Sequence, residues 1–155
     1  MDVRRATVED VPWLLVELRE FAAHYPITNV SLFGSDAHAE GLLLALIGGQ
    51  YVAIAQRGAE RMGLIAGGVA PHPYNPDLLV ASELWWWVTP AHRGTTAGYR
   101  LLASFHEWAR QQGADLATMT LASNSAVRPG TLERLGYRET ERAFTYAFTA
   151  AEVAA

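Results

Sequence analysis

The feature that most constrains this chain is an abrupt change, over residues 90–98, from a strand-like segment to a helix-like one. The segment that precedes it ends in "ELWWWV" and is almost entirely apolar. Pro90 cannot donate to a sheet ladder and therefore ends the strand. Apolar residues then recur at helical spacing until Gly113. The pattern predicts a buried strand at 79–88, a turn, and an amphipathic helix at 97–112.

A turn of this kind is suited to bind an anion. The first N–H groups of a helix have no intrahelical partner, and the helix dipole adds partial positive charge at the same end. Gly94 and Gly98 permit close approach, Arg93 supplies a full charge, and Thr95 and Thr96 supply hydroxyl donors. A short glycine motif is weak evidence by itself. The residues are therefore consistent with a phosphate site and equally with an ordinary turn that carries a surface arginine.

The rest of the chain predicts a mixed sheet with helices packed on it, which is an α+β fold. Thr7 and Asp10 resemble a capping box at the start of the first helix, and Gly67-Gly68 predicts a bulge or a close approach in a strand. Together the patterns predict strands at 3–6, 51–56, 62–70, 79–88 and 116–121, a loop at 71–77, helices from 11, at 36–47, at 97–112 and at 126–135, and a final strand region at 137–148. We expect a single domain over residues 1–150, followed by a short tail at 151–155.

Composition excludes several classes of function. The net charge is −4, all twelve basic residues are arginine, and there is no cysteine. Without a basic excess, nucleic-acid binding is not expected, and without cysteine there is no thiolate ligand or nucleophile. The first ten residues lack the apolar core of a signal peptide, and the longest apolar run is far too short to span a membrane. We therefore expect a cytoplasmic protein without a membrane contact. Because the histidines show no metal-ligand spacing, we also expect no metal site.

The segment "VTPAHRGTTAG" resembles motif A of the GCN5-related N-acetyltransferase (GNAT) superfamily, a Val, a Pro and then Arg/Gln-x-x-Gly-x-Gly/Ala. The segment "NSAVRPGTLERLGYRE" resembles its motif B, and the resemblance covers nearly the whole chain in order. Three positions depart from the pattern. Thr96 replaces the middle glycine, Leu132 stands where many members have the tyrosine that protonates the leaving thiolate, and Asn124 is one residue out of register, with Ser125 at the matching position.

The resemblance implies the GNAT fold, a mostly antiparallel twisted sheet that splays at its fourth and fifth strands, with about four helices around it. It also implies acetyl-coenzyme A as co-substrate, with its diphosphate on the turn. The residues that the resemblance implies as coenzyme contacts are Trp87, Val88, Arg93, Gly94, Thr95, Thr96, Ala97, Gly98, Asn124 and Arg128. The residues that we expect to contact the acceptor, from the proline-rich loop and the tryptophan strand, are His72, Tyr74, Asn75 and Trp85.

Glu83 is the best candidate for a general base. A carboxylate in an apolar strand is desolvated, which raises its pKa toward neutrality. The glutamate of many family members stands six residues before the motif valine, whereas Glu83 stands five before Val88. Because alternate residues of a strand face opposite sides, this shift turns Glu83 away from the site unless a bulge restores the phase. The alternative is a structural glutamate at a strand edge.

The resemblance predicts an acetyl-coenzyme A-dependent N-acetyltransferase in which a primary amine attacks the thioester directly in a ternary complex. The acceptor is a small molecule or a protein amine. The alternatives are a catalytically weak or inactive acyl-coenzyme A-binding module and, less favoured, a protein that binds another phosphate-bearing nucleotide. Many members dimerise through their last strands, and the apolar "RAFTYAF" permits a homodimer here. A looser similarity connects the chain to acetyltransferase-like proteins of bacteriophages.

Overall fold

The computed structural model describes residues 1–27 and 30–148 of the chain. Five strands form one sheet in the order β1-β2-β3-β4-β5. They are β1 (Asp2–Arg5), β2 (Tyr51–Arg57), β3 (Glu60–His72), β4 (Asn75–Val88) and β5 (Leu116–Thr118). Neighbouring strands pair antiparallel from β1 to β4, and β4 and β5 pair parallel. The mixed, mostly antiparallel sheet expected from the sequence is confirmed.

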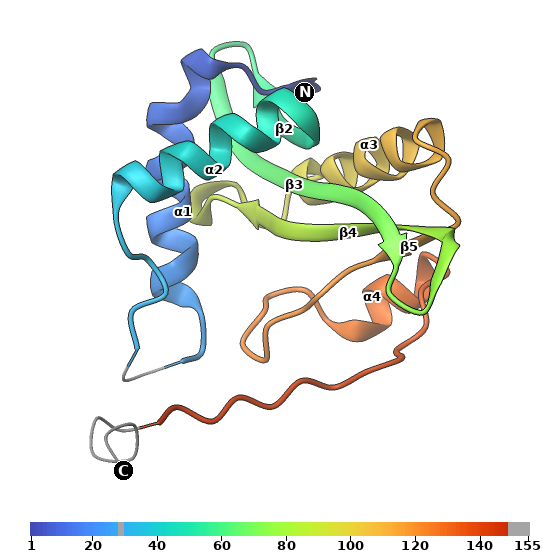
Figure 1. Cartoon of the computed structure of the whole chain (residues 1–155). Helices are drawn as coiled ribbons and strands as arrows, with labels where there is room; N and C mark the ends of the chain where they lie inside the picture. Colours follow the sequence, from blue (N-terminus) through green and yellow to red (C-terminus); the bar gives the residue numbers. More distant parts are fainter. Residues whose placement is uncertain (28–29, 149–155) are drawn as a thin grey trace.

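The helices cover the two faces of this sheet (Figure 1). They are α1 (Val11–His24), α2 (Asp36–Gly49), α3 (Ala97–Gln111) and the short α4 (Pro129–Arg134), with 3-10 turns η1 (Val8–Asp10) and η2 (Pro90–His92). One core cluster joins α1 and α2 to one face of the sheet, and a second joins α3 to the other face. None of the helices in the described ranges has the length and apolar character that crossing a bilayer requires.

The start of α1 is fixed by the predicted capping box. The main-chain N–H of Thr7 donates to Asp10 Oδ2 at 2.9 Å, and the reciprocal contact is also present. Asp10 is buried, and its carboxylate pairs with Arg4 of β1 at 2.7 Å and with Arg61 of β3 at 3.0 Å. These two guanidinium groups lower the pKa of Asp10. One carboxylate thus connects β1, β3 and the helix entry.

A β-bulge in β4 confirms the irregularity predicted near Gly67. Ala66 pairs with Trp85 and Gly67 pairs with Glu83, so Leu84 is the extra residue. A Cβ atom on Gly67 would lie 2.5 Å from the main-chain oxygen of Ser82 and 2.7 Å from the ring of Phe105. Only glycine therefore allows β3, β4 and α3 to approach this closely.

The sheet splays immediately beyond this bulge. β4 and β5 are paired only from Val80 to Ser82, opposite Leu116 to Thr118. The sequence predicted a longer fifth strand, through residue 121. The strand ends early because the N–H of Thr120 donates to the Glu83 carboxylate at 3.2 Å instead of to the backbone of β4. The gap between β4 and the chain that follows β5 starts here.

Two other predictions of local structure were wrong. The loop expected at 71–77 is mostly strand, because β3 and β4 continue to a tight hairpin in which His72 pairs with Asn75. Pro73 lies in the turn and Pro76 in an unpaired stretch of β4, so neither removes a ladder hydrogen bond.

The strand region expected at 137–148 contains no regular strand. The segment runs extended past α4 (Figure 1), and the side chains of Phe144 and Phe148 are 94% and 69% exposed. A strand forms by pairing along an edge, and the sheet of the described residues has no strand from this segment. The homodimer expected through it stays a prediction, as does the single-domain boundary, and the predicted tail at 151–155 lies outside the described residues.

Candidate active site

A cavity of about 620 Å³ occupies the splayed side of β4. Its walls come from β4 from Glu83 onward, from the start of α3, from the segment that follows β5, from α4 and from the end of α1. The volume is typical of a small-molecule site. The cavity is therefore the candidate site, and residues predicted from the sequence line part of it.

The turn between β4 and α3 leaves main-chain donors free at residues that line this cavity. Gly94 has φ +82°, a conformation that favours glycine. Thr95 Oγ1 donates to the main-chain oxygen of His92 at 2.7 Å and accepts from the N–H of Ala97 at 3.3 Å. In contrast, no acceptor within the described chain engages the N–H groups of Gly94 and Gly98. Free N–H groups at a helix start form an anion site.

Arg93 is held beside this turn by two contacts. Its guanidinium lies 4.6 Å from the centroid of the Trp87 ring, and its Nε donates to the main-chain oxygen of Val88 at 3.3 Å. Trp87 is itself fixed, because its indole N–H donates to Glu17 Oε2 of α1 at 2.7 Å. Burial raises the pKa of Glu17, which is 9% exposed. A buried carboxylate thus orients the tryptophan on which the arginine rests.

Glu83 lines the same cavity from the α3 side of the sheet. Paired residues of antiparallel strands share a face, and Gly67, the partner of Glu83, faces Phe105 of α3. Trp85 and Trp87 pack on the opposite face, so the Leu84 bulge separates the two sets. Burial raises the pKa of Glu83 to about 7, and the hydrogen bond from the Thr120 N–H partly opposes that rise. The bulge that the sequence analysis required is present, and Glu83 reaches the cavity.

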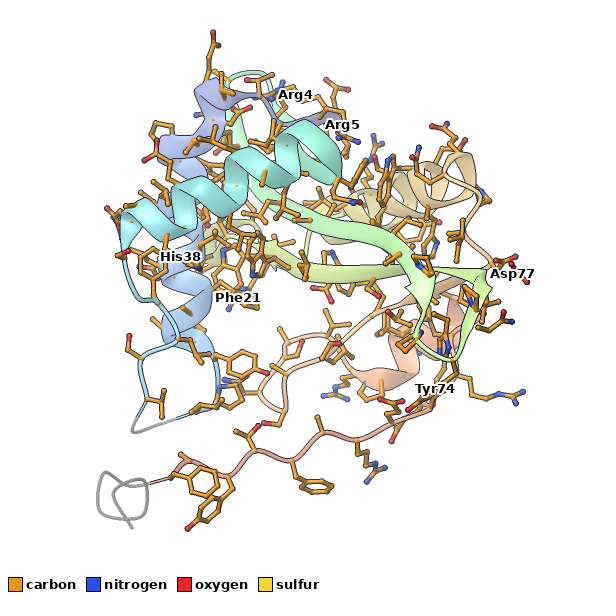
Figure 2. The ribbon with its side chains drawn as sticks, viewed as in Figure 1. Arg4, Arg5, Phe21, His38, Tyr74 and Asp77 are labelled. Atoms are coloured by element: carbon orange, nitrogen blue, oxygen red, sulfur yellow. The ribbon has the colours of Figure 1, made fainter. Side chains whose placement is uncertain are left out.

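The end of α1 forms a second wall that the sequence analysis missed. Phe21, His24 and Tyr25 line the cavity there, and Figure 2 shows Phe21 on the sheet side of α1. Asn124 joins this wall to the segment after β5, because its Nδ2 donates to the main-chain oxygen of His24 at 2.6 Å. The wall was missed because the apolar residues of α1 follow an ordinary core spacing. The only available signal was a cluster of rings in the last turn.

Eight of the fifteen predicted site residues meet at the cavity and the others do not. Those that line it are Glu83, Trp87, Val88, Arg93, Gly94, Thr95, Gly98 and Asn124. Thr96 instead points its hydroxyl toward the sulfur of Met1, at 3.7 Å, and Ala97 is buried in the core. Arg128 precedes α4 without lining the cavity, and Trp85 packs against the α1–α2 core.

The residues expected to contact the acceptor lie elsewhere. His72, Tyr74 and Asn75 are at the tip of the β3–β4 hairpin, where Tyr74 projects outward and is 93% exposed (Figure 2). They do not line the cavity. Their role in acceptor binding stays a prediction that this geometry does not favour.

A second, smaller cavity of about 300 Å³ adjoins the first at Leu135. His106 and Tyr137 line it, and His106 Nε2 is hydrogen-bonded to the Tyr137 hydroxyl. Burial, together with the charge of Glu83, raises the pKa of Tyr137 to about 12. Within residues 1–27 and 30–148, no three side chains are arranged to hold a metal ion.

Comparison with known proteins agrees with this architecture. The family model of the acetyltransferase (GNAT) family matches residues 13–137. No curated protein matches the chain. Among solved structures, a GCN5-related N-acetyltransferase from Ralstonia eutropha JMP134 is similar with a TM-score of 0.76 and 16% identity, over 94% of this chain and 97% of that one.

Two further structures show the same fold. A ribosomal-protein-alanine N-acetyltransferase from Brucella melitensis biovar Abortus 2308 has a TM-score of 0.72 at 15% identity, over 96% of this chain and 100% of that one. A predicted acetyltransferase from Clostridium acetobutylicum, solved with acetyl-CoA, has a TM-score of 0.72 at 12% identity, over 94% and 95%. The looser similarity to bacteriophage proteins stays a prediction.

Proposed function

Since this chain belongs to the GNAT family of acetyltransferases, we propose that it is an N-acetyltransferase that acetylates a primary amine in a ternary complex with acetyl-coenzyme A. When bound, the coenzyme supplies the thioester that the amine attacks. The observation that carries the proposal is that one cavity is lined both by residues of the turn at 93–98, whose free N–H groups suit an anion, and by Glu83, a carboxylate with a pKa near neutrality.

The turn fits the diphosphate of the coenzyme. The free N–H groups of Gly94 and Gly98 and the charge of Arg93 provide donors, and Arg93 is already oriented by Trp87 and Val88. The threonine that replaces the family's middle glycine need not crowd the anion, because the Thr96 hydroxyl is directed toward Met1. We expect the diphosphate to bind to the backbone of this turn.

Val88 offers a main-chain N–H beside the splay. The N–H of Thr89 donates to the main-chain oxygen of Met62 on β3 at 3.0 Å. Because backbone groups of successive strand residues point to opposite edges, the N–H of Val88 points to the edge where β5 has ended. We propose that it donates to the oxygen of the acetyl group, on which negative charge develops during transfer.

Glu83 would act as the general base. The ammonium form of an alkylamine has a pKa of about 10 and must lose a proton before it can attack. A carboxylate with a pKa of about 7 is largely ionised just above neutral pH and is a far better proton acceptor than an ordinary glutamate. Leu132, which stands at the family's usual tyrosine position, is buried and carries no proton to donate. Glu83 is therefore the one acid–base group that we assign.

Calorimetry with acetyl-coenzyme A, coenzyme A and ATP tests the binding half of this proposal, and release of free coenzyme thiol on addition of amines tests the chemical half. The Glu83→Gln variant should lose at least about tenfold in turnover near pH 7.5 while its coenzyme affinity is nearly unchanged. Turnover that equals that of the wild type removes Glu83 from the mechanism. Coenzyme binding without acetylation of any amine supports the alternative, a binding module.

Isotopically labelled acetyl-coenzyme A gives an independent readout. Because the sequence contains no lysine, any acetylated lysine that carries the label must belong to a supplied acceptor and not to the enzyme itself. The rate should rise with pH through an apparent pKa of about 7 and then level, since Glu83 must be ionised to accept a proton. A rate that falls across the same pH range contradicts the assignment.

A further inference from the structure

Four rings converge on one wall of the cavity. Phe21 and His24 come from the last turn of α1, Tyr25 follows it directly, and Trp87 comes from β4. The centroids of the Phe21 and Trp87 rings are 5.9 Å apart in an edge-on arrangement, those of His24 and Trp87 are 5.3 Å apart, and those of Phe21 and Tyr25 are 6.3 Å apart. We call these four residues the aromatic wall.

The charges around the cavity are few. Of the described residues that line it, Glu83 is the only acid, and the only basic side chains are Arg93 and His24. The nearby carboxylate of Glu17 is buried and already accepts the indole N–H of Trp87. A polyamine or a basic peptide needs several carboxylates for its additional charges. Such acceptors would find only the Glu83 carboxylate among the residues that line the cavity, so an acceptor with one amine fits better.

His24 provides one directional polar contact within the aromatic wall. Its Nδ1 lies 2.7 Å from the main-chain oxygen of Glu20, and since a carbonyl only accepts, Nδ1 carries the hydrogen. In the neutral ring, Nε2 then has a free lone pair. His24 is solvent-exposed, and no residue in the described part of the chain donates to this nitrogen. His24 can therefore accept a hydrogen bond from an amine or a hydroxyl group of the acceptor.

The aromatic wall and the turn at residues 93–98 line the same cavity. The hydrogen bond from Asn124 to the main-chain oxygen of His24 joins the end of α1 to the segment that follows β5. Inside this enclosure, about 620 Å³ has to accommodate the thioester arm and the acceptor together. The space favours a compact acceptor over a side chain presented by a folded protein.

We propose that the acceptor is a small primary amine attached to an aromatic or other flat apolar group, which packs on the aromatic wall while its polar end meets His24 Nε2. This inference rests on the proposed acetyltransferase activity and specifies the acceptor class. Ring-to-ring contacts add to the free energy gained by burying apolar surface, and Phe21 and Tyr25 provide those contacts from the end of α1 and the residue that follows it.

A panel of amines at equal concentration, assayed by thiol release, tests the proposal. Phenethylamine, tyramine and tryptamine represent the proposed class, and putrescine, spermidine and a lysine-containing peptide represent polycationic and protein acceptors. The kcat/KM for the best aromatic amine should exceed that for the best member of the second group by at least about tenfold. An equal or higher value for a polyamine or the peptide overturns the inference, and so does coenzyme binding with no acetylated aromatic amine.

Variants of the aromatic wall locate the acceptor. Phe21→Leu keeps an apolar side chain but removes the ring, and it should raise KM for the aromatic amine by about tenfold while KM for acetyl-coenzyme A stays within about twofold. His24→Phe keeps a ring but removes Nε2, the hydrogen-bond acceptor, and it should also raise KM for tyramine. Val16→Ala changes an exposed residue of the same helix outside the cavity and should match the wild type.

Two checks keep the result decisive. If Phe21→Leu does not fold, as judged by its thermal unfolding, Tyr25→Leu serves as the second variant with the same expectation. A variant that raises KM equally for aromatic and aliphatic amines shows no role for the aromatic wall and overturns the inference. Failure of the wild-type protein to bind acetyl-coenzyme A in calorimetry is a different result, because it overturns the proposed function itself.

Discussion

Along its edge with β3, strand β4 forms ten residue pairs, whereas along its edge with β5 it forms three. On the β3 side, Gly63 and Gly67 allow contacts that a Cβ atom would block. On the β5 side, the bulge at Leu84 and the early end of β5 leave backbone groups and the Glu83 carboxylate facing a cavity. The comparison shows that β4 is paired along nearly its whole length on one edge, whereas most of its other edge is left open to the cavity.

The largest expected effect comes from disrupting the closed edge of β4, where it pairs with β3. Gly67→Val should lower the free energy of unfolding by about 4 kcal/mol or more, because its Cβ would lie 2.5 Å from the main-chain oxygen of Ser82. Urea denaturation followed by circular dichroism measures the loss. Gly41→Ala is the matched control, since nothing lies within 4 Å of a Cβ there, and alanine inside α2 should stabilise by about 0.5–1 kcal/mol. Equal stability of the valine variant and the wild type would contradict the proposed packing.

The next effect concerns Asp10, also on the closed side. Asp10→Asn should lower the free energy of unfolding at pH 7 by about 3 kcal/mol, because Arg4 and Arg61 lose the carboxylate that pairs them. The folded pKa of Asp10 is lowered, so its contribution is complete above about pH 4 and is lost as the pH falls through the folded value. The difference between the two proteins should therefore shrink in acid. Coenzyme affinity at pH 7, measured by calorimetry, should stay unchanged.

Glu83 should show the opposite pH dependence, on the open side. Its folded pKa of about 7 lies above the unfolded value of about 4.3, so ionisation opposes folding, and wild-type stability should fall as the pH rises from about 4 to about 7. Glu83→Gln should be more stable than the wild type at pH 8 by on the order of 1 kcal/mol, a value reduced for partial solvent screening, and equal to it near pH 4. Unfolding at three pH values measures this. A stability difference that does not change with pH would contradict the raised pKa.

The smallest expected effect concerns the hydrogen bond between Trp87 of β4 and Glu17 of α1. Glu17→Leu removes both a buried carboxylate and its hydrogen bond to Trp87, so the change in unfolding free energy should be within about 1 kcal/mol. Coenzyme should nevertheless bind about threefold more weakly, since Arg93 rests on a less fixed indole. Glu17→Gln retains an acceptor and should restore the affinity. Calorimetry measures the coenzyme affinity of both variants. Wild-type affinity in the leucine variant would show that coenzyme binding by Arg93 does not depend on the Glu17 contact to Trp87.

Local features of the fold could be predicted from the sequence. The helix expected at 97–112 is α3, Ala97–Gln111, and the capping box at Thr7 and Asp10 is present. Both depend on residues within a few positions of one another. The expected final strand at 137–148 depends instead on a distant edge with which to pair, and alternation of apolar residues does not supply that edge.

The candidate site was predictable only in part, for the same reason. The arginine and the two glycines of the turn, Arg93, Gly94 and Gly98, lie within six positions of one another, and all three line the cavity. The face that Glu83 takes depends on how Gly67, Ser82 and Phe105 pack around the bulge. The aromatic wall depends on where α1 ends relative to β4. Neither arrangement leaves a periodic signal in the sequence, so both required the structure.

The link between Asn124 and the main chain of His24 joins two segments that lie one hundred positions apart in sequence. It is solvent-exposed, so water can replace it, at a net cost of about 1 kcal/mol. Such a cost leaves the parted form populated at roughly one molecule in six. The end of α1 and the segment that follows β5 can thus separate through the loss of a single side-chain contact, with no strand leaving the sheet.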